Sequence, residues 1–361
     1  MKYLKKALIL AFVLVLCSCN VPSRSGSPTK NDPLLSPWQN NAAMALSRAM
    51  TDLNARRGDS DLLTITNAGY ACLDGESTLS LADIVRNETG CTVGQRSLLF
   101  VHAPESAPLW FALYRRDTHE AVFSKWADGK FQHQALGLNP DHILTPDGWE
   151  TAGEGVVSGN LFQVVSFCLV WSAEPRTGLL KSAELHNHIC PGVNAGYALA
   201  QYIKKRLPLR DGEKYVLVSA PPACPVDGLQ TALDCTAGKK AMFTMKTSHK
   251  VLGQHEYKKL KPSVIVLRIN SAADSCEGSV LAFDFEKACN DLGVSRSNLS
   301  PPGGHDNPLF YISRIRIARK MAGMKTEQKM GWIKVLKTFS GKAELADKLA
   351  GASFDPYADL P

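Results

Sequence analysis

Two histidines and a cysteine alternate in the segment HNHICPG, at His186, His188 and Cys190. In an extended chain, alternate side chains point to the same face, so two imidazoles and a thiol can converge there. Imidazole and thiolate are ligands that suit zinc, iron or copper. The spacing therefore predicts a transition-metal site, with zinc as the favoured ion.

Two cysteines stand immediately before a proline and a predicted helix: Cys190 before Pro191, and Cys224 before Pro225. A cysteine at a helix N-terminus feels the positive end of the helix dipole, which lowers the pKa of its thiol. We therefore add Cys224 to the predicted metal ligands. Either thiol is also a candidate catalytic nucleophile, with a histidine as its base.

Asp227 and Cys235 follow Cys224 closely in the sequence PVDGLQTALDC. We expect both side chains to support the metal ligands without binding the ion themselves. Simpler interpretations stay open for the whole group. The histidines can be ordinary surface or core residues, the cysteines can pack as small hydrophobic side chains, and Cys190 can form a disulfide with Cys224.

The elements that must position these residues are visible as apolar periodicities. Apolar runs predict strands at 62–66, 97–102, 110–114, 214–220 and 263–270. Helical spacing is found at 38–60, 193–207, 225–235 and 307–322. We read 116–160 as long loops because of its Gly, Asp and Pro residues, and 161–171 as a buried strand or strand pair.

A partial internal repeat links the two parts of the chain. ADIVRNETGCTVGQR at 82–96 aligns with VDGLQTALDCTAGKK at 226–240, which matches Asp83 and Cys91 with Asp227 and Cys235. The pentapeptide NAGYA also occurs twice, at 67–71 and 194–198, but at an offset that differs by 17 residues. The repeat predicts two related α+β halves, of which only the second contains HNHICPG.

Together, HNHICPGVNAGY and ACPVDGLQTALDCTAGKK resemble the FmdE family, which takes its name from a component of formylmethanofuran dehydrogenase. The matching residues are His186, His188, Cys190, Pro191, Gly192, Gly196 and Tyr197 in the first block, and Cys224, Val226, Asp227, Gln230, Cys235, Thr236, Gly238 and Lys239 in the second. The resemblance implies an α+β core with mixed or antiparallel sheets flanked by helices, often dimeric, with a metal-binding site at the His/Cys block. No cysteine follows Cys289, so the C-terminal zinc finger of some members is not expected.

The N-terminus has the pattern of a bacterial lipoprotein signal. A basic start is followed by the apolar residues 7–16, and then by Leu16, Ser18 and Cys19. The apolar run suits a signal peptide and is too short to cross a bilayer. We expect cleavage before Cys19 and lipid on that cysteine, which would place the protein outside the cytoplasm on a membrane. An ordinary secretory signal is the alternative.

These patterns divide the chain into five predicted segments. They are a signal peptide (1–18), a flexible tether (19–37), a degenerate FmdE-like half (38–160), an FmdE core (161–295) and a polar, helical C-terminal extension (296–361).

The composition and the absence of common catalytic motifs argue against several classes of function. The net charge of +7 falls to +4 once the three lysines of residues 1–18 are removed, which is too mild to indicate nucleic-acid binding. No GxSxG, Walker A, GxGxxG or HExxH occurs.

We predict a membrane-anchored metal-binding protein with a possible small-molecule ligand, either a monomer with an internal pseudo-dimer or a homodimer. The alternatives are a thiol enzyme using Cys190 or Cys224 and a non-catalytic envelope binding module.

Overall fold

A computed structural model describes residues 35–255, 260–352 and 355–361 of the chain. The predicted signal peptide, Cys19 and most of the predicted tether lie outside these residues. The described part starts just before helix α1 (Pro37–Asp52), whose first helical position is a proline, as is common. None of the described helices is both long and apolar enough to cross a membrane.

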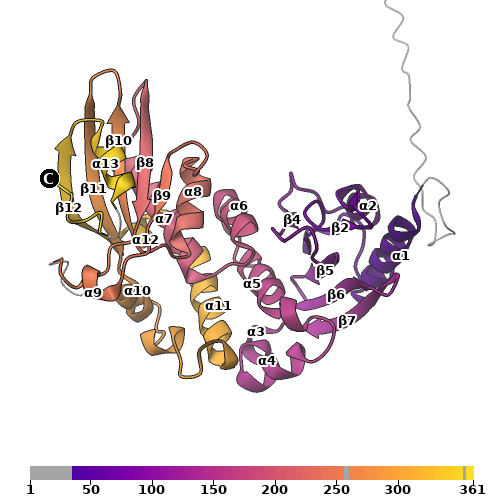
Figure 1. Ribbon diagram of the computed structural model, residues 1–361. Coiled ribbons are helices and arrows are strands. Elements are labelled where there is room, and N and C mark those ends of the chain that lie inside the picture. The colour runs from indigo at the N-terminus through magenta and orange to yellow at the C-terminus, as the bar shows by residue number, and fades with distance from the viewer. Residues whose placement is uncertain (1–34, 256–259, 353–354) are drawn as a thin grey trace, which may run out of the picture.

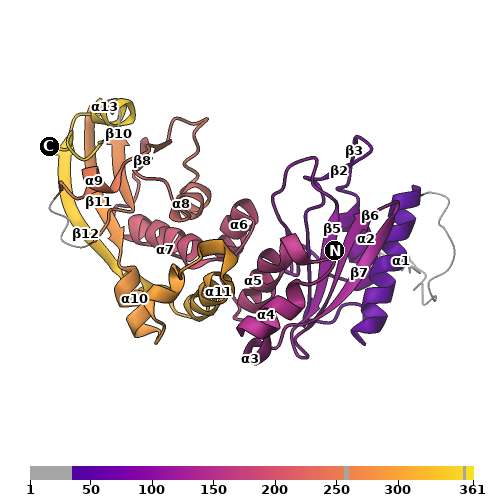
Figure 2. The ribbon, with the colours of Figure 1, turned by 60° about the horizontal axis from the view of Figure 1, so that its bottom comes forward.

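The chain forms two five-stranded mixed sheets with helices between and around them (Figure 1, Figure 2). The first sheet has the order β4-β1-β5-β6-β7. Its strands are β1 (Leu62–Thr66), β4 (Leu98–Phe100), β5 (Trp110–Arg115), β6 (Glu120–Ala127) and β7 (Lys130–Gly137). Only β1 and β4 run parallel. A small hairpin, β2 (Cys72–Leu73) and β3 (Glu76–Ser77), lies apart.

The second sheet repeats the pattern of the first. Its order is β9-β8-β10-β11-β12, and again only one pair, β8 and β9, is parallel. The strands are β8 (Glu213–Ser219), β9 (Met242–Thr244), β10 (Val264–Asn270), β11 (Ser275–Phe283) and β12 (Ile333–Gly341). Mixed sheets flanked by helices make the protein α+β, as predicted.

Helices fill the space between the two sheets (Figure 2). This layer contains α5 (Leu161–Trp171), α6 (Thr177–His186), α7 (Pro191–Arg206), α8 (Pro225–Leu233) and α11 (Pro308–Ala322), with α3 (Pro140–Ile143) and α4 (Pro146–Gly153) at its edge. Helices α1 and α2 (Leu81–Thr89) cover the outer face of the first sheet. Helix α13 (Leu345–Gly351) packs on the outer face of the second. The remaining helices are α9 (His249–Leu252), α10 (Phe285–Asp291) and α12 (Thr326–Met330).

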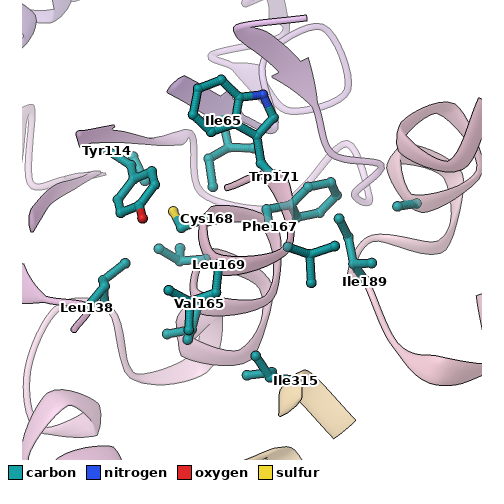
Figure 3. Close-up of a cluster of buried hydrophobic side chains, with 14 of the residues drawn as sticks. Ile65, Tyr114, Leu138, Val165, Phe167, Cys168, Leu169, Trp171, Ile189 and Ile315 are labelled. Carbon is teal, nitrogen blue, oxygen red and sulfur yellow. The ribbon is translucent and has the colours of Figure 1, made fainter. Parts of the chain in front are cut away.

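The prediction of a strand at 161–171 is wrong, because this run is the helix α5. Phe167 and Cys168 are fully buried, and the helix lies between Ile65 and Tyr114 of the first sheet and Ile315 of α11 (Figure 3). A helix enclosed on both sides is apolar all round, so its sequence lacks the one-sided stripe that would distinguish it from a buried strand.

The prediction of long loops at 116–160 is also wrong for most of that segment. It contains β6, β7, α3 and α4. Strands β6 and β7 are joined at Asp128 and Gly129, which both have positive φ. An Asp-Gly pair is a strong signal for a tight hairpin, so this element could have been predicted from the sequence.

The helix predicted at 38–60 is confirmed as α1 but ends eight residues earlier, at Asp52. The other predicted strands and helices are confirmed within a few residues at their ends, including β1, β8, β10, α7 and α11.

The predicted C-terminal extension at 296–361 is not a separate appendage. Strand β12 pairs along its length with β11 and completes the second sheet. Helix α11 packs against the helices of the central layer, where Ile315 and Ile317 are buried. The sequence did not predict these contacts because the segment is polar. Strand β12 is an edge strand, and many of its side chains are exposed.

The C-T-x-G match marks equivalent places in the two sheets. Along the chain, helix α2 comes between β1 and β4, the parallel strands of the first sheet. Helix α8 likewise comes between β8 and β9, the parallel strands of the second sheet. Both helices end in a left-handed residue, Gly90 or Asp234, and the buried Cys91 or Cys235 follows. The two NAGYA pentapeptides are not equivalent, because 67–71 follows β1 whereas 194–198 lies inside α7. A common origin of the two halves stays a prediction.

Candidate metal centre

Three helix ends bring three predicted ligands together. His186 is the last residue of α6, Cys190 is the N-cap of α7, and Cys224 is the N-cap of α8. Their ligand atoms all lie within 4.8 Å of one another. Within the described ranges, this is the one group of three or more His, Cys, Asp or Glu side chains that has metal-ligand spacing.

The segment HNHICPG is a tight connection between two helices and not an extended strand. Helix α6 is capped by Asn187, whose φ of 60° is the left-handed conformation that commonly terminates helices. Helix α7 then begins with Pro191 in its first turn, and the Cys190 thiol accepts a hydrogen bond from the backbone N–H of Val193. His186 and Cys190 therefore converge because a helix end folds back on a helix start.

The start of α8 reaches this point only because α7 presents glycine. A β-carbon at Gly192 would overlap the Cβ atom of Cys224, and one at Gly196 would overlap the backbone carbonyl of Pro225. Neither residue has a positive φ, so the requirement is for space. The spacing C-P-G-x3-G thus encodes the close approach of the two helices, which sequence reasoning did not draw from it.

Asp227, on the first turn of α8, orients the imidazole of His186. Its Oδ2 lies 2.7 Å from the Nδ1 atom of His186. With Nδ1–H donated to the carboxylate, Nε2 points to the thiols and lies 3.5 Å from Cys190 Sγ. A histidine that binds a metal usually donates its other N–H to a carboxylate or carbonyl in this way. Asp227 makes the supporting contact expected of it.

His188 and Cys235 are not part of the converging group. The ring of His188 lies beside that of His186, with 4.2 Å between the ring centroids, and it also contacts the ring of Phe162, at 4.7 Å. Cys235 is buried in the core of the second sheet, where its thiol contacts the backbone carbonyls of Tyr215 and Leu233. The supporting role expected of Cys235 is therefore replaced by a packing role.

The ligand atoms carry strongly shifted pKa values. Burial lowers the pKa of His186, but the hydrogen bonds with Asp227 and Cys224 outweigh it and raise the value to about 9. Hydrogen bonds from Cys190 and His186 lower the pKa of the Cys224 thiol. The hydrogen bond to Cys224 and burial raise the pKa of the Cys190 thiol. Without a metal, the arrangement is therefore an imidazolium beside the Cys224 thiolate.

Burial, together with the charges of His186 and Arg314, lowers the pKa of His188 to about 3. This imidazole is neutral at ordinary pH. Its Nδ1 atom lies 3.0 Å from the side-chain oxygen of Asn187. An amide oxygen only accepts, so Nδ1 carries the proton.

One pair of the donor atoms has the separation expected in a tetrahedral metal site. For a metal–nitrogen bond of about 2.0 Å and a metal–sulfur bond of about 2.3 Å, the two ligand atoms stand roughly 3.5 Å apart. The distance between His186 Nε2 and Cys190 Sγ is 3.5 Å. Cys190 is buried whereas Cys224 is exposed, so the group is open to solvent on the Cys224 side.

Free thiols are present at all eight described cysteines, so the alternative of a Cys190–Cys224 disulfide does not describe this structure.

Serines take the places of the two cysteines in the first half. Helices α1 and α7 both have 16 residues and begin with proline, and Ser36 is the N-cap of α1 where Cys190 is that of α7. Ser80 is the N-cap of α2, as Cys224 is of α8, and both helices have nine residues. Oxygen replaces sulfur at both positions, so the first half lacks the soft donors of the second.

Comparison with known families agrees with this site. Residues 185–288 match the family model described as FmdE, Molybdenum formylmethanofuran dehydrogenase operon. The match contains every residue of the candidate centre, from His186 to Asp227. The chain therefore carries an FmdE domain, and the resemblance predicted from its two motif blocks is confirmed for this segment. A search of curated proteins found no match.

Proposed function

We propose that this protein is a membrane-tethered FmdE-family protein that binds a transition metal, with zinc as the favoured ion, through His186, Cys190 and Cys224. The observation that carries the proposal is the convergence of one imidazole and two thiols within 4.8 Å, with Asp227 fixing the imidazole. Bound zinc with three protein ligands keeps a fourth position for water or a substrate, where it acts as a Lewis acid.

Each side chain has a defined part in this proposal. Asp227 holds the proton of His186 Nδ1, which leaves the Nε2 lone pair for the ion. Cys190 is fixed by the N–H of Val193 and supplies the buried sulfur. Cys224 supplies the exposed sulfur, so exchange of the ion with solvent takes place on its side.

Metal analysis of the purified protein tests the proposal. We expect close to one ion per chain in the wild type, and strong loss in Cys190→Ser and Cys224→Ser. Cys72→Ser, a half-buried cysteine of the β2–β3 hairpin, is the matched control and should keep its metal. His188→Ala tests the fourth ligand predicted from sequence. Equal metal content in wild type, Cys190→Ser and Cys224→Ser would refute the proposal.

A thiol-based reaction is the second candidate, and one observation favours it. Cys224 is exposed, has a lowered pKa and lies beside His186, which is the arrangement of an activated nucleophile. Metal-free protein should then be alkylated by iodoacetamide at Cys224 well below pH 8.5, the ordinary value for a thiol. Buried Cys190 provides the slow internal comparison. A Cys224 profile centred on the ordinary value would exclude this candidate.

A further inference from the structure

A pocket of about 570 Å³ opens next to the candidate centre and is lined by two residues of the HNHICPG motif that are not part of the centre. His188, which the donor group leaves out, forms part of the pocket wall together with Asn187. The rest of the wall comes from α4, α5, the segment between them, and α11, all of which lie outside this motif in sequence. The pocket therefore exists only because the central helical layer brings these elements together.

Three aromatic side chains form a continuous wall that leads to the centre. Trp149 and Tyr311 are stacked, with 5.4 Å between ring centroids and 10° between ring planes. Phe162 contacts Tyr311 at 5.1 Å and His188 at 4.7 Å. His188 in turn lies against His186, a member of the donor group. We call Trp149, Phe162 and Tyr311 the aromatic wall.

The charged side chains that line the pocket are both acidic, while the cationic His186 and Arg314 act on His188 from behind its wall. Glu150 and Glu154 line it, and no lysine or arginine does. Arg314, one turn beyond Tyr311 on α11, is held over the ring of Phe310 and donates to the Phe310 carbonyl, so it does not line the pocket. Aromatic faces attract cations, and carboxylates at the rim add to this attraction.

We propose that this pocket binds an organic cation that carries an aromatic ring, such as a protonated arylalkylamine, and holds it next to the candidate centre. The aromatic wall stacks on the ring of the ligand, and Glu150 and Glu154 select its positive charge. His188 separates the pocket from the donor group and acts as a positioning residue. That the ligand is the substrate of the metal centre rests on the proposed function, whereas binding to the pocket does not.

A series of three matched probes tests the proposal on the full chain by calorimetry. Tryptamine carries a positive charge on an indole, tryptophol is its neutral counterpart, and indole-3-propionate is the anionic one. We expect tryptamine to bind about tenfold tighter than tryptophol, because Glu150 and Glu154 attract its positive charge. Indole-3-propionate should bind most weakly.

Variants locate the binding. In the double variant Glu150→Gln/Glu154→Gln, the preference for tryptamine over tryptophol should largely disappear. Tyr311→Leu should weaken both probes. Glu327→Gln, a charge change on α12 away from the pocket, is the control and should bind like the wild type.

Loss of tryptamine binding can be told apart from loss of metal binding. Cys224→Ser should lose metal but still bind tryptamine, because Cys224 does not line the pocket. Absence of tryptamine binding, equal affinity for indole-3-propionate, or an unchanged preference in the double glutamine variant would each overturn the proposal, whatever the metal content.

Discussion

Asp227 Oδ2 lies 2.7 Å from His186 Nδ1, on a helix that starts at Cys224, so the same first turn of α8 supplies a candidate ligand and orients another. The orientation of His186 and the position of Cys224 therefore both depend on this one short helix. Residues that are 41 positions apart in sequence become parts of one group.

The first prediction concerns this contact. Asp227→Asn keeps the shape of the side chain but removes the carboxylate that fixes the tautomer of His186. We expect metal affinity to fall about 10- to 100-fold, with the fold intact. Competition with a chelator measures the affinity. Asp234→Asn, at the exposed end of the same helix, is the control. An unchanged affinity in Asp227→Asn would exclude its supporting role.

The close packing of α7 on α8 gives the second prediction. Gly192→Ala places a methyl group where the Cβ atom of Cys224 now lies, so α8 must shift. We expect a loss of about 1–3 kcal/mol in the free energy of unfolding and weaker metal binding. Gly238→Ala, where an added β-carbon meets nothing within 4 Å, should leave both unchanged. Chemical denaturation and metal analysis check this, and two indistinguishable variants would contradict it.

Metal binding should depend on pH. His186 has a pKa of about 9 and the pKa of Cys190 is raised, so both are protonated at neutral pH and must lose a proton to bind metal. Affinity therefore rises with pH, with a slope of up to about two protons per ion. Calorimetry in buffers of different ionisation enthalpy measures the protons released. Binding without proton release would contradict this assignment.

In the metal-free protein, His186 also links stability to pH. Its pKa is higher in the folded chain than the unfolded value of about 6.5. The stabilisation it provides is therefore fully present below about pH 6.5 and is lost as the pH rises through about 9. Added metal should remove this dependence, because it replaces the proton.

His188 predicts sensitivity to acid. Its folded pKa of about 3 lies below the unfolded value of about 6.5, so the unfolded chain takes up a proton that the folded chain does not. Stability should decrease as the pH falls from 6.5 toward 3, by on the order of 3 kcal/mol. His188→Gln should lack this decrease, whereas His305→Gln, an exposed histidine, should keep it. Denaturation at pH 7 and pH 4 compares them.

The membrane tether is the last prediction. If Cys19 carries lipid, the wild type should fractionate with membranes and incorporate labelled palmitate. Cys19→Ala should do neither. Cys17→Ala, two residues earlier, tests the choice of cysteine and should behave like the wild type. Equal membrane recovery of the Cys19→Ala and wild-type chains would show that no lipid on Cys19 is needed.

The sequence by itself determined the local chemistry of the centre. The types of His186, Cys190, Cys224 and Asp227, and the prolines that start α7 and α8, are signals carried by a few neighbouring residues. They predicted which side chains to consider, and the structure brings these four together. The C-T-x-G match likewise depends on a short segment, and it marked equivalent positions at Cys91 and Cys235.

Only the tertiary structure determined which faces of the helices and sheets pack against one another. Apolar periodicity cannot separate a helix buried on both sides from a strand, so α5 became clear only through its contacts with Ile65 and Ile315. His188 is not in the donor group but lies against Phe162 of α5, which in turn contacts Tyr311 of α11. Such contacts join residues that are 26 positions apart for Phe162 and His188 and 149 positions apart for Phe162 and Tyr311, and they depend on packing that no local spacing records.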